Sequence, residues 1–204
     1  YEIWQPQLDF FKDCSTLSYD ILGHGKSSLN KEKISFDDFS NQLVNLIDEL
    51  KINKIHLVGF SIGSLIARNF ATKFSDRLES LILLGSIYKR SEQQQKIVNE
   101  RFDQAKKELK LSKQALKRWF TDKYLENNPE TYEKISSILA SNNMTHFLKV
   151  YELFVKHKNE EDFKKIKANT LIMTGELDVG STVEMSQELN KIISNSQLKI
   201  IKDC

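Results

Sequence analysis

The segment from Gly59 to Gly63, with the sequence GFSIG, decides how this chain folds. It directly follows the apolar run Ile55 to Val58 (IHLV) and directly precedes a segment, Leu65 to Phe70, in which apolar residues recur with helical spacing. A serine at such a junction predicts a sharp turn from a strand into a helix, and the flanking glycines would let the two elements pass close together. The turn would expose the hydroxyl of Ser61. It would also place the backbone amide of Ile62 at the helix start, where an anion can bind.

Strand-like apolar segments alternate with helical patterns on both sides of this turn. The expected strands are Thr16–Ile21, Lys54–Phe60, Leu78–Gly85, Asn169–Glu176 and Gln197–Lys202. The expected helices of the same region are 36–50, with Ser35 as N-cap, Ile62–Lys73 and Ser181–Ile193. The order strand, helix, strand predicts an α/β protein with a mostly parallel, doubly wound sheet.

Glycine usage divides the chain. All seven glycines lie at predicted turns, whereas residues 86–174 contain none and are rich in Lys, Glu, Gln and Leu. The spacing there is helical throughout, with helix starts at Ser112 and at Asn128-Pro129. We therefore expect residues 1–88 and 166–204 to form two parts of one core, and residues 89–165 to form an inserted helical cap.

Composition excludes several classes of partner. The 204 residues are 40% hydrophobic and 28% charged, with a formal charge of +2 and no basic cluster interleaved with aromatic side chains, so we expect no nucleic acid partner. No apolar run approaches the ~20 residues that span a bilayer, and the first residues do not resemble a signal peptide. The only cysteines, Cys14 and Cys204, are far apart in sequence, which favours a cytoplasmic location. The oligomeric state is not predicted.

Two residues carry the predicted chemistry. Ser61 is a candidate nucleophile, and its alternative is an ordinary N-cap serine. Asp178 follows the predicted strand Asn169–Glu176 at its carboxyl end, the edge at which open α/β sheets gather their sites. The alternatives there are that Asp178 caps the helix starting near Ser181, or that Glu176 is the acid.

The histidines do not indicate a metal site, because no two of them have ligand spacing with a carboxylate. We expect His24 to be a structural turn residue; its alternative role as the base is disfavoured because it precedes Ser61 in the chain. We expect His56 to lie in a strand, as a core or strand-face residue, and His146 and His157 to pack or face solvent on cap helices. Trp119 is predicted either to belong to the core or to form a wall of a substrate pocket under the cap.

Four stretches resemble the α/β-hydrolase superfamily, and together they cover nearly the whole chain. They are Asp20–Ser27 (DILGHGKS), Gly59–Gly63 (GFSIG), Leu78–Gly85 (LESLILLG) and Thr170–Asp178 (TLIMTGELD). The segments Arg118–Thr121 (RWFT) and Asp178–Thr182 (DVGST) further resemble the enol-lactonase-like branch. That branch includes lactonases, esterases, C–C bond hydrolases and cofactor-free haloperoxidase-type enzymes.

The resemblance implies a serine hydrolase that acts on an ester or lactone of a small molecule through an acyl-enzyme, without a cofactor. Ser61 would be the nucleophile, Asp178 the acid and the Ile62 amide one oxyanion donor. The family places a catalytic histidine after the acid and a second oxyanion amide before a segment that Trp4 resembles, and neither position is present here. We therefore expect a hydrolase truncated at both ends, inactive in this 204-residue form.

Two alternatives come from other functional classes. One is a non-catalytic homologue that keeps only a small-molecule pocket. The other is a helical interaction module built on the insert, although its many Lys and Glu residues favour a solvated outer face.

Overall fold

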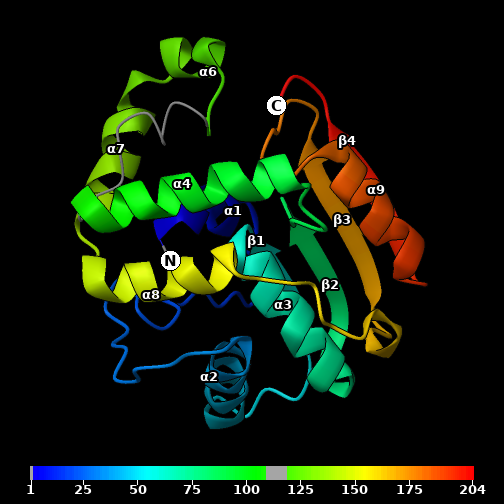
Figure 1. Ribbon diagram of the computed structural model, residues 1–204. Coiled ribbons are helices and arrows are strands. Elements are labelled where there is room, and N and C mark those ends of the chain that lie inside the picture. The colour runs from blue at the N-terminus through cyan, green and yellow to red at the C-terminus, as the bar shows by residue number, and fades with distance from the viewer. Residues whose placement is uncertain (1, 109–118) are drawn as a thin grey trace. The chain divides into compact units, whose positions relative to one another are not determined.

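The computed structural model describes residues 2–108 and 119–204 (Figure 1). Contacts within the chain define two compact units, which are described separately below. The sheet unit comprises Ile34–Glu100 and Leu153–Cys204, and the helical unit comprises Tyr1–Lys33 and Arg101–Glu152. The boundaries of these two units differ from those of the predicted core and cap, whose division at residues 88 and 165 stays a prediction.

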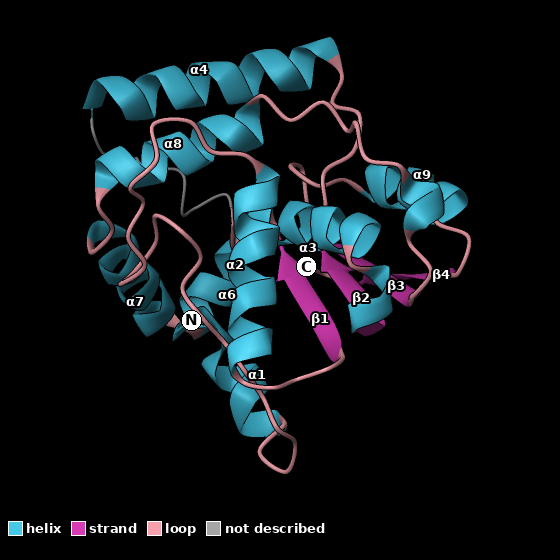
Figure 2. Ribbon diagram, turned by 90° about the horizontal axis from the view of Figure 1, so that it is seen from below, coloured by secondary structure: helices cyan, strands magenta, loops and turns pink. Residues whose placement is uncertain are grey.

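The sheet unit contains a four-stranded parallel sheet in the order β1-β2-β3-β4 (Figure 2). The strands are β1 (Ile55–Phe60), β2 (Leu78–Leu84), β3 (Asn169–Gly175) and β4 (Ser196–Ile201). Phe60 pairs with Leu84, which in turn pairs with Met173, so β1, β2 and β3 end at one edge of the sheet. The parallel sheet and these four strands confirm the predicted fold class.

Helices α3 (Ile62–Lys73) and α9 (Val183–Ile192) cover the same face of this sheet (Figures 1 and 2). Helix α3 contacts β1 and β2, and α9 contacts β3 and β4. The buried side of α3 is mostly apolar, with Leu65, Ile66, Ala67, Phe70 and Ala71, and it also contains Ser64 and Arg68. Burial of this stripe against the strands fixes the direction in which α3 leaves β1.

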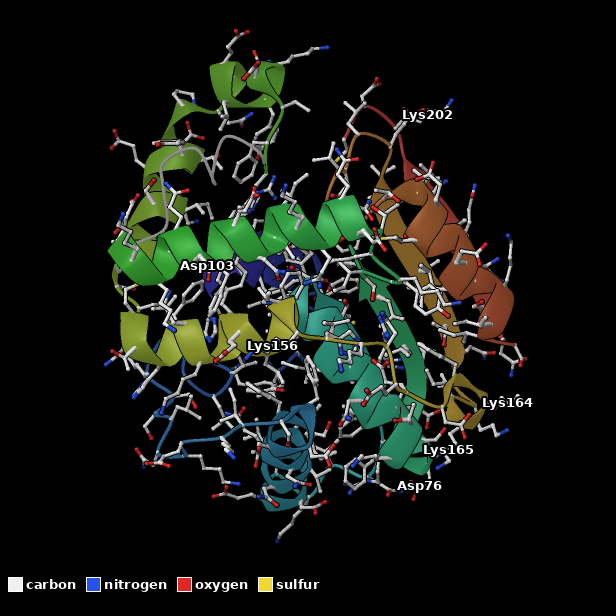
Figure 3. All side chains as sticks on the ribbon, in the orientation of Figure 1. Asp76, Asp103, Lys156, Lys164, Lys165 and Lys202 are labelled. Atoms are coloured by element: carbon white, nitrogen blue, oxygen red, sulfur yellow. The ribbon has the colours of Figure 1, made fainter. Side chains whose placement is uncertain are left out.

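Helix α2 (Phe36–Glu49) packs on α3. It begins as predicted, because Ser35 and Asp38 form a capping box in which the Asp38 carboxylate accepts from the Ser35 amide at 2.9 Å. Two short 3₁₀ helices, η2 (Ser75–Arg77) and η3 (Phe163–Lys165), precede β2 and β3. Lys164 and Lys165 of η3 are exposed (Figure 3).

The helical unit contains η1 (Glu2–Trp4), α1 (Gln5–Phe10), α6 (Asp122–Asn127) and α7 (Pro129–Ala140). It also holds the part of α4 (Glu92–Glu108) from Arg101 onward and the part of α8 (Met144–Val155) up to Glu152. Pro129 opens α7 with Asn128 as its N-cap, as predicted, whereas the helix start predicted at Ser112 lies outside the described residues. The described part of 88–166 is helix, turn and loop without a strand, in line with the predicted helical insert.

The strand predicted at Thr16–Ile21 is wrong. This segment is loop, and the four strands of the described residues all lie in the sheet unit. Apolar and β-branched residues favour a strand only where a neighbouring strand completes the hydrogen-bond ladder. The loop instead leads into a turn at Gly23 and His24 that packs on α8, where the His24 and Phe147 rings lie 5.6 Å apart.

Candidate functional site

Ser61 lies between β1 and α3 with a backbone conformation that L-residues rarely adopt. Its φ is 53° and its ψ is −118°. The Ser61 amide donates to the carbonyl of Leu84 at 3.0 Å, which ties the turn to the end of β2. A non-glycine residue at positive φ persists only where its surroundings enforce it, and such positions cluster at functional sites.

The two glycines of the turn have unequal roles. A Cβ added at Gly59 would overlap the backbone carbonyl of Gly63, so the close approach of strand and helix requires glycine at position 59. A Cβ at Gly63 would meet open space. The prediction that both glycines permit the close approach is therefore correct for Gly59 alone.

The hydroxyl of Ser61 is not used as a helix cap. Ser61 occupies the N-cap position of α3, but among the described residues its side chain makes no capping hydrogen bond. The backbone carbonyl of Ser61 instead accepts from the amide of Ser64 at 2.9 Å and from the Ser64 hydroxyl at 2.5 Å. The amide of Ile62, in the first turn of α3, has no acceptor within the helix by geometry. The half-buried Ser61 hydroxyl and this amide thus stand at the same helix end.

Asp178 lies in the turn that follows β3 and organises that turn with its own side chain. Its Oδ1 accepts from the amide of Gly180 at 2.7 Å and from the amide of Ser181 at 2.9 Å. Helix α9 is capped instead by Thr182, whose hydroxyl accepts from the Met185 amide at 3.4 Å. The alternative role of Asp178 as the cap of that helix is therefore wrong.

Gly85, directly after β2, lies between the two predicted site residues. A Cβ at Gly85 would stand 3.5 Å from the Phe60 ring, next to Ser61 in sequence, and 3.7 Å from Oδ2 of Asp178. Its carbonyl accepts from the Ser181 hydroxyl at 2.8 Å. Adjacent strands lie about 4.8 Å apart, so β1 and β3, with β2 between them, are separated by roughly 10 Å. The carboxyl edge of the sheet thus brings Ser61 and Asp178 into one neighbourhood.

Glu176, the rival acid, is exposed, and its Oε2 accepts from the Asp203 amide at 3.4 Å, beyond the end of β4. Trp119 precedes α6 in the helical unit, and 54% of its surface is exposed. A core role for Trp119 is therefore wrong, and its role as a pocket wall stays a prediction.

Three histidines have the structural surroundings expected of them. His24 is a turn residue whose Nδ1 lies 3.4 Å from the carbonyl oxygen of Leu22, and burial lowers the pKa of its ring. His56 lies on the exposed face of β1 and pairs with the Ser80 hydroxyl at 2.8 Å. His146 lies in α8. Among the described residues, no group of three or more His, Cys, Asp or Glu side chains could hold a metal ion.

His157 differs from its prediction. It lies in the loop after α8, not in a helix, and its Nε2 is 3.2 Å from Oε1 of Glu161. The same carboxylate oxygen pairs with Arg68 of α3 at 2.8 Å, and all three side chains are at most 8% exposed. The loop that carries His157 and Glu161 is thus bonded to the buried Arg68 of α3, a contact that no local sequence pattern reports.

The carboxyl group of Glu161 titrates below its usual range. Burial alone would raise its pKa, but the hydrogen bond with His157 and the charge of Arg68 outweigh burial and lower it. For Arg68, burial lowers the pKa of the guanidinium, and the negative charge of Glu161 opposes that shift. This cluster was not predicted from the sequence. The available signal was an arginine inside the apolar stripe of α3.

Comparison with known proteins decides the family. The sequence profile of the alpha/beta hydrolase fold family matches residues 1–204. The chain belongs to this family. A 3-oxoadipate enol-lactonase of Acinetobacter baylyi is 26% identical to this α/β-hydrolase over 98% of the chain and 75% of the relative.

Two further matches extend over most of the chain. An (E)-2-((N-methylformamido)methylene)succinate hydrolase of the same organism is 27% identical, over 92% of this chain and 72% of its own. The crystal structure of the enol-lactonase from Burkholderia xenovorans superposes with a TM-score of 0.89 at 24% identity, covering 98% of this chain and 77% of that one. This last similarity supports the fold alone. In the described residues, none of the helices has the length and apolar content needed to cross a membrane.

Proposed function

We propose that this α/β-hydrolase cleaves a carboxylic ester or lactone of a small molecule, with Ser61 as nucleophile and an acyl-enzyme as intermediate. The observation that carries the proposal is the backbone of Ser61, whose φ of 53° at the junction of β1 and α3 keeps its hydroxyl out of the helix cap. The names of two relatives, an enol-lactonase and a hydrolase, support the same reaction class.

The proposed chemistry uses three groups of this chain. Oγ of Ser61 attacks the carbonyl carbon while a base removes its proton, and the negative charge that develops on the carbonyl oxygen is stabilised by the Ile62 amide. The alcohol group of the substrate leaves the carbonyl carbon with a proton from the base. Water then hydrolyses the acyl-enzyme, which releases the carboxylic acid product and restores the Ser61 hydroxyl. Asp178 orients the base and stabilises its protonated form.

The separation of the two turns suits an imidazole as this base. A histidine ring can hydrogen-bond through both of its nitrogens, each bond being about 2.8 Å long. Such a ring can join two side chains that follow strands with one other strand between them. The Oδ1 atom of Asp178 is already bonded to the amides of Gly180 and Ser181, so Oδ2, on the side of Gly85, is the oxygen suited to the imidazole.

The identity of the base rests on the family resemblance, which places a histidine after the acid. Residues 179–204 contain no histidine, and the inactivity of the 204-residue polypeptide stays a prediction. We propose a small-molecule substrate as the only partner, with no cofactor. The cytoplasmic location also stays a prediction, supported by Cys14 and Cys204, which are both free and exposed.

An activity-based probe tests this proposal. In protein expressed from the complete reading frame, a fluorophosphonate should label Ser61, and Ser61→Ala should abolish the labelling because the elbow exposes and activates this hydroxyl. Ser35→Ala is the matched control, since Ser35 is also an N-cap serine and belongs to a helix packed on α3. Equal labelling of the Ser61→Ala protein would contradict the nucleophile. Absence of labelling in the parent protein would favour a non-catalytic binding protein.

A further inference from the structure

Arg68 is a fully buried charge on α3, seven residues and about two helical turns beyond Ser61. Its guanidinium joins two segments that are far apart in sequence. On one side, Nη1 donates to the carbonyl of Ile87 at 2.7 Å and to the hydroxyl of Ser86 at 3.3 Å. On the other side, Nη2 lies 2.8 Å from the Glu161 carboxylate and donates to Oδ1 of Asn159 at 3.2 Å.

The first of these segments leads directly to the predicted acid. Ser86, which is fully buried, follows Gly85 in the chain, and the carbonyl of Gly85 accepts from the hydroxyl of Ser181 at 2.8 Å. The amide of Ser181 donates to Oδ1 of Asp178 at 2.9 Å. An unbroken series of covalent and hydrogen bonds within the sheet unit therefore runs from the helix that carries Ser61 at its start to the turn that carries Asp178.

Stability alone does not account for an arginine at this position. Removing a guanidinium from water is costly, and buried ion pairs can often be replaced by apolar side chains without loss of stability. Leu65 and Ala71, three residues before and after Arg68 on α3, are buried and apolar, although Ser64 is buried and polar, so most of this face would accept a large aliphatic residue. An aliphatic residue could not hold the carbonyl of Ile87 and the carboxylate of Glu161 together, as the rigid, planar fork of arginine does.

We propose that Arg68 is a positioning residue of the hydrolase site: it fixes the loop from Gly85 to Ile87 and, through Ser181, the direction of the Asp178 carboxylate. This inference rests on the proposed roles of Ser61 and Asp178. Arg68 acts on the acid, not on the substrate. Its loss should lower kcat and leave KM nearly unchanged, because a misplacement of about 1 Å in a catalytic group can cost roughly 100-fold in rate.

Arg77 provides a matched control. Its guanidinium binds two backbone carbonyls and one carboxylate: Asn53 O at 2.6 Å, Ile52 O at 2.8 Å and Asp48 at 2.7 Å. These contacts lie where β1 and β2 begin, at the opposite edge of the sheet from Ser61. Arg77→Met therefore removes another arginine that binds both backbone and carboxylate groups, without touching the acid turn.

The experiment compares Arg68→Met with Arg77→Met in protein expressed from the complete reading frame, using a short-chain p-nitrophenyl ester and the rate of fluorophosphonate labelling. We expect kcat and the labelling rate to fall roughly 10- to 100-fold for Arg68→Met, with KM within about threefold of the parent value. Arg77→Met should lower thermal stability but keep kcat within about twofold. Equal kcat for the two variants would overturn the proposal.

A double-mutant cycle decides the question if Arg68→Met does not fold. Arg68→Lys keeps the charge but loses the fork, and Ser181→Ala removes the hydroxyl that binds Gly85. If both act through one series of bonds, the double variant should lose clearly less in kcat than the product of the two single losses. Independent, multiplicative losses would overturn the proposal. Activity that survives Ser61→Ala and Asp178→Asn would instead refute the proposed function itself.

Discussion

The two turns at the carboxyl edge of the sheet are held in different ways. The turn at Ser61 depends on backbone conformation: a positive φ at the serine, a bond from its amide to Leu84, and a Gly59 that no larger residue can replace without a shift of backbone. The turn at Asp178 depends on side chains. The Asp178 carboxylate binds two amides, and the Ser181 hydroxyl binds the Gly85 carbonyl.

The turns of the two predicted site residues are therefore held by different kinds of group, that of Ser61 by the backbone and that of Asp178 by side chains. The Ser61 hydroxyl is placed by backbone groups: the positive φ of the serine, the close approach of Gly59 to Gly63 and the bond to the Leu84 carbonyl. The Asp178 carboxylate is held by the amides of Gly180 and Ser181, and the Ser181 hydroxyl bonds to Gly85 in the loop after β2, which in turn bonds to Arg68. We therefore expect substitutions to affect the Ser61 turn through folding and the Asp178 turn through catalysis.

The largest expected effect is the loss of kcat when the negative charge of Asp178 is removed. Asp178→Asn keeps a carbonyl oxygen that can accept from the amides of Gly180 and Ser181, so the turn should persist. The neutral amide cannot stabilise a protonated base, and kcat should fall by on the order of 10⁴ with little change in KM. Steady-state kinetics of protein from the complete reading frame measures this. Glu176→Gln is the control, and a large loss in that variant alone would show that Glu176 is the acid.

A second comparison tests the backbone-held turn with its two glycines. Gly59→Ala forces a Cβ into the carbonyl of Gly63, which cannot move as a flexible side chain would, so the free energy of unfolding should fall by about 3 kcal/mol. Gly63→Ala fills open space at a helical position and should raise it by up to about 1 kcal/mol. Urea denaturation measures both. If the two variants shifted stability equally, the close approach at Gly59 would not constrain the turn.

The smallest expected effect is a pH dependence of the network around Arg68. Glu161 has a pKa below its unfolded value of about 4.3, so its contribution to stability is fully present above that pH and is lost as pH falls through the lower, folded pKa. Unfolding free energies measured from about pH 5 downward should fall less steeply for Glu161→Gln than for the parent. In the control Glu188→Gln, which removes an exposed pair with Lys191, we expect the slope to change only at low salt. An unchanged slope in Glu161→Gln would show that this carboxylate is not held by Arg68.

Sequence reasoning was most successful where the signal is local. The helix predicted at Ile62–Lys73 has the observed bounds, and the Ser35 cap and the strand before Ser61 follow from residue type and spacing over a few positions. The strand predicted at Thr16–Ile21 failed because a strand exists only with a partner, and no local pattern reports whether one is present. His157 was misplaced for a related reason: its ring lies 3.4 Å from Arg68, 89 residues earlier in the chain, and no local pattern reports such a contact.

The sequence by itself determined the parallel α/β order, the turn that presents Ser61 and the candidate acid Asp178, because each depends on residues that are neighbours along the chain. The tertiary structure alone decided that Gly59 but not Gly63 is sterically required, that Thr182 and not Asp178 caps α9, and that Arg68 joins the loop after β2 to Glu161. These outcomes depend on which atoms meet after the chain has closed on itself. Sequence spacing carries no record of such contacts, whereas close packing and buried hydrogen bonds fix them to within a fraction of an ångström.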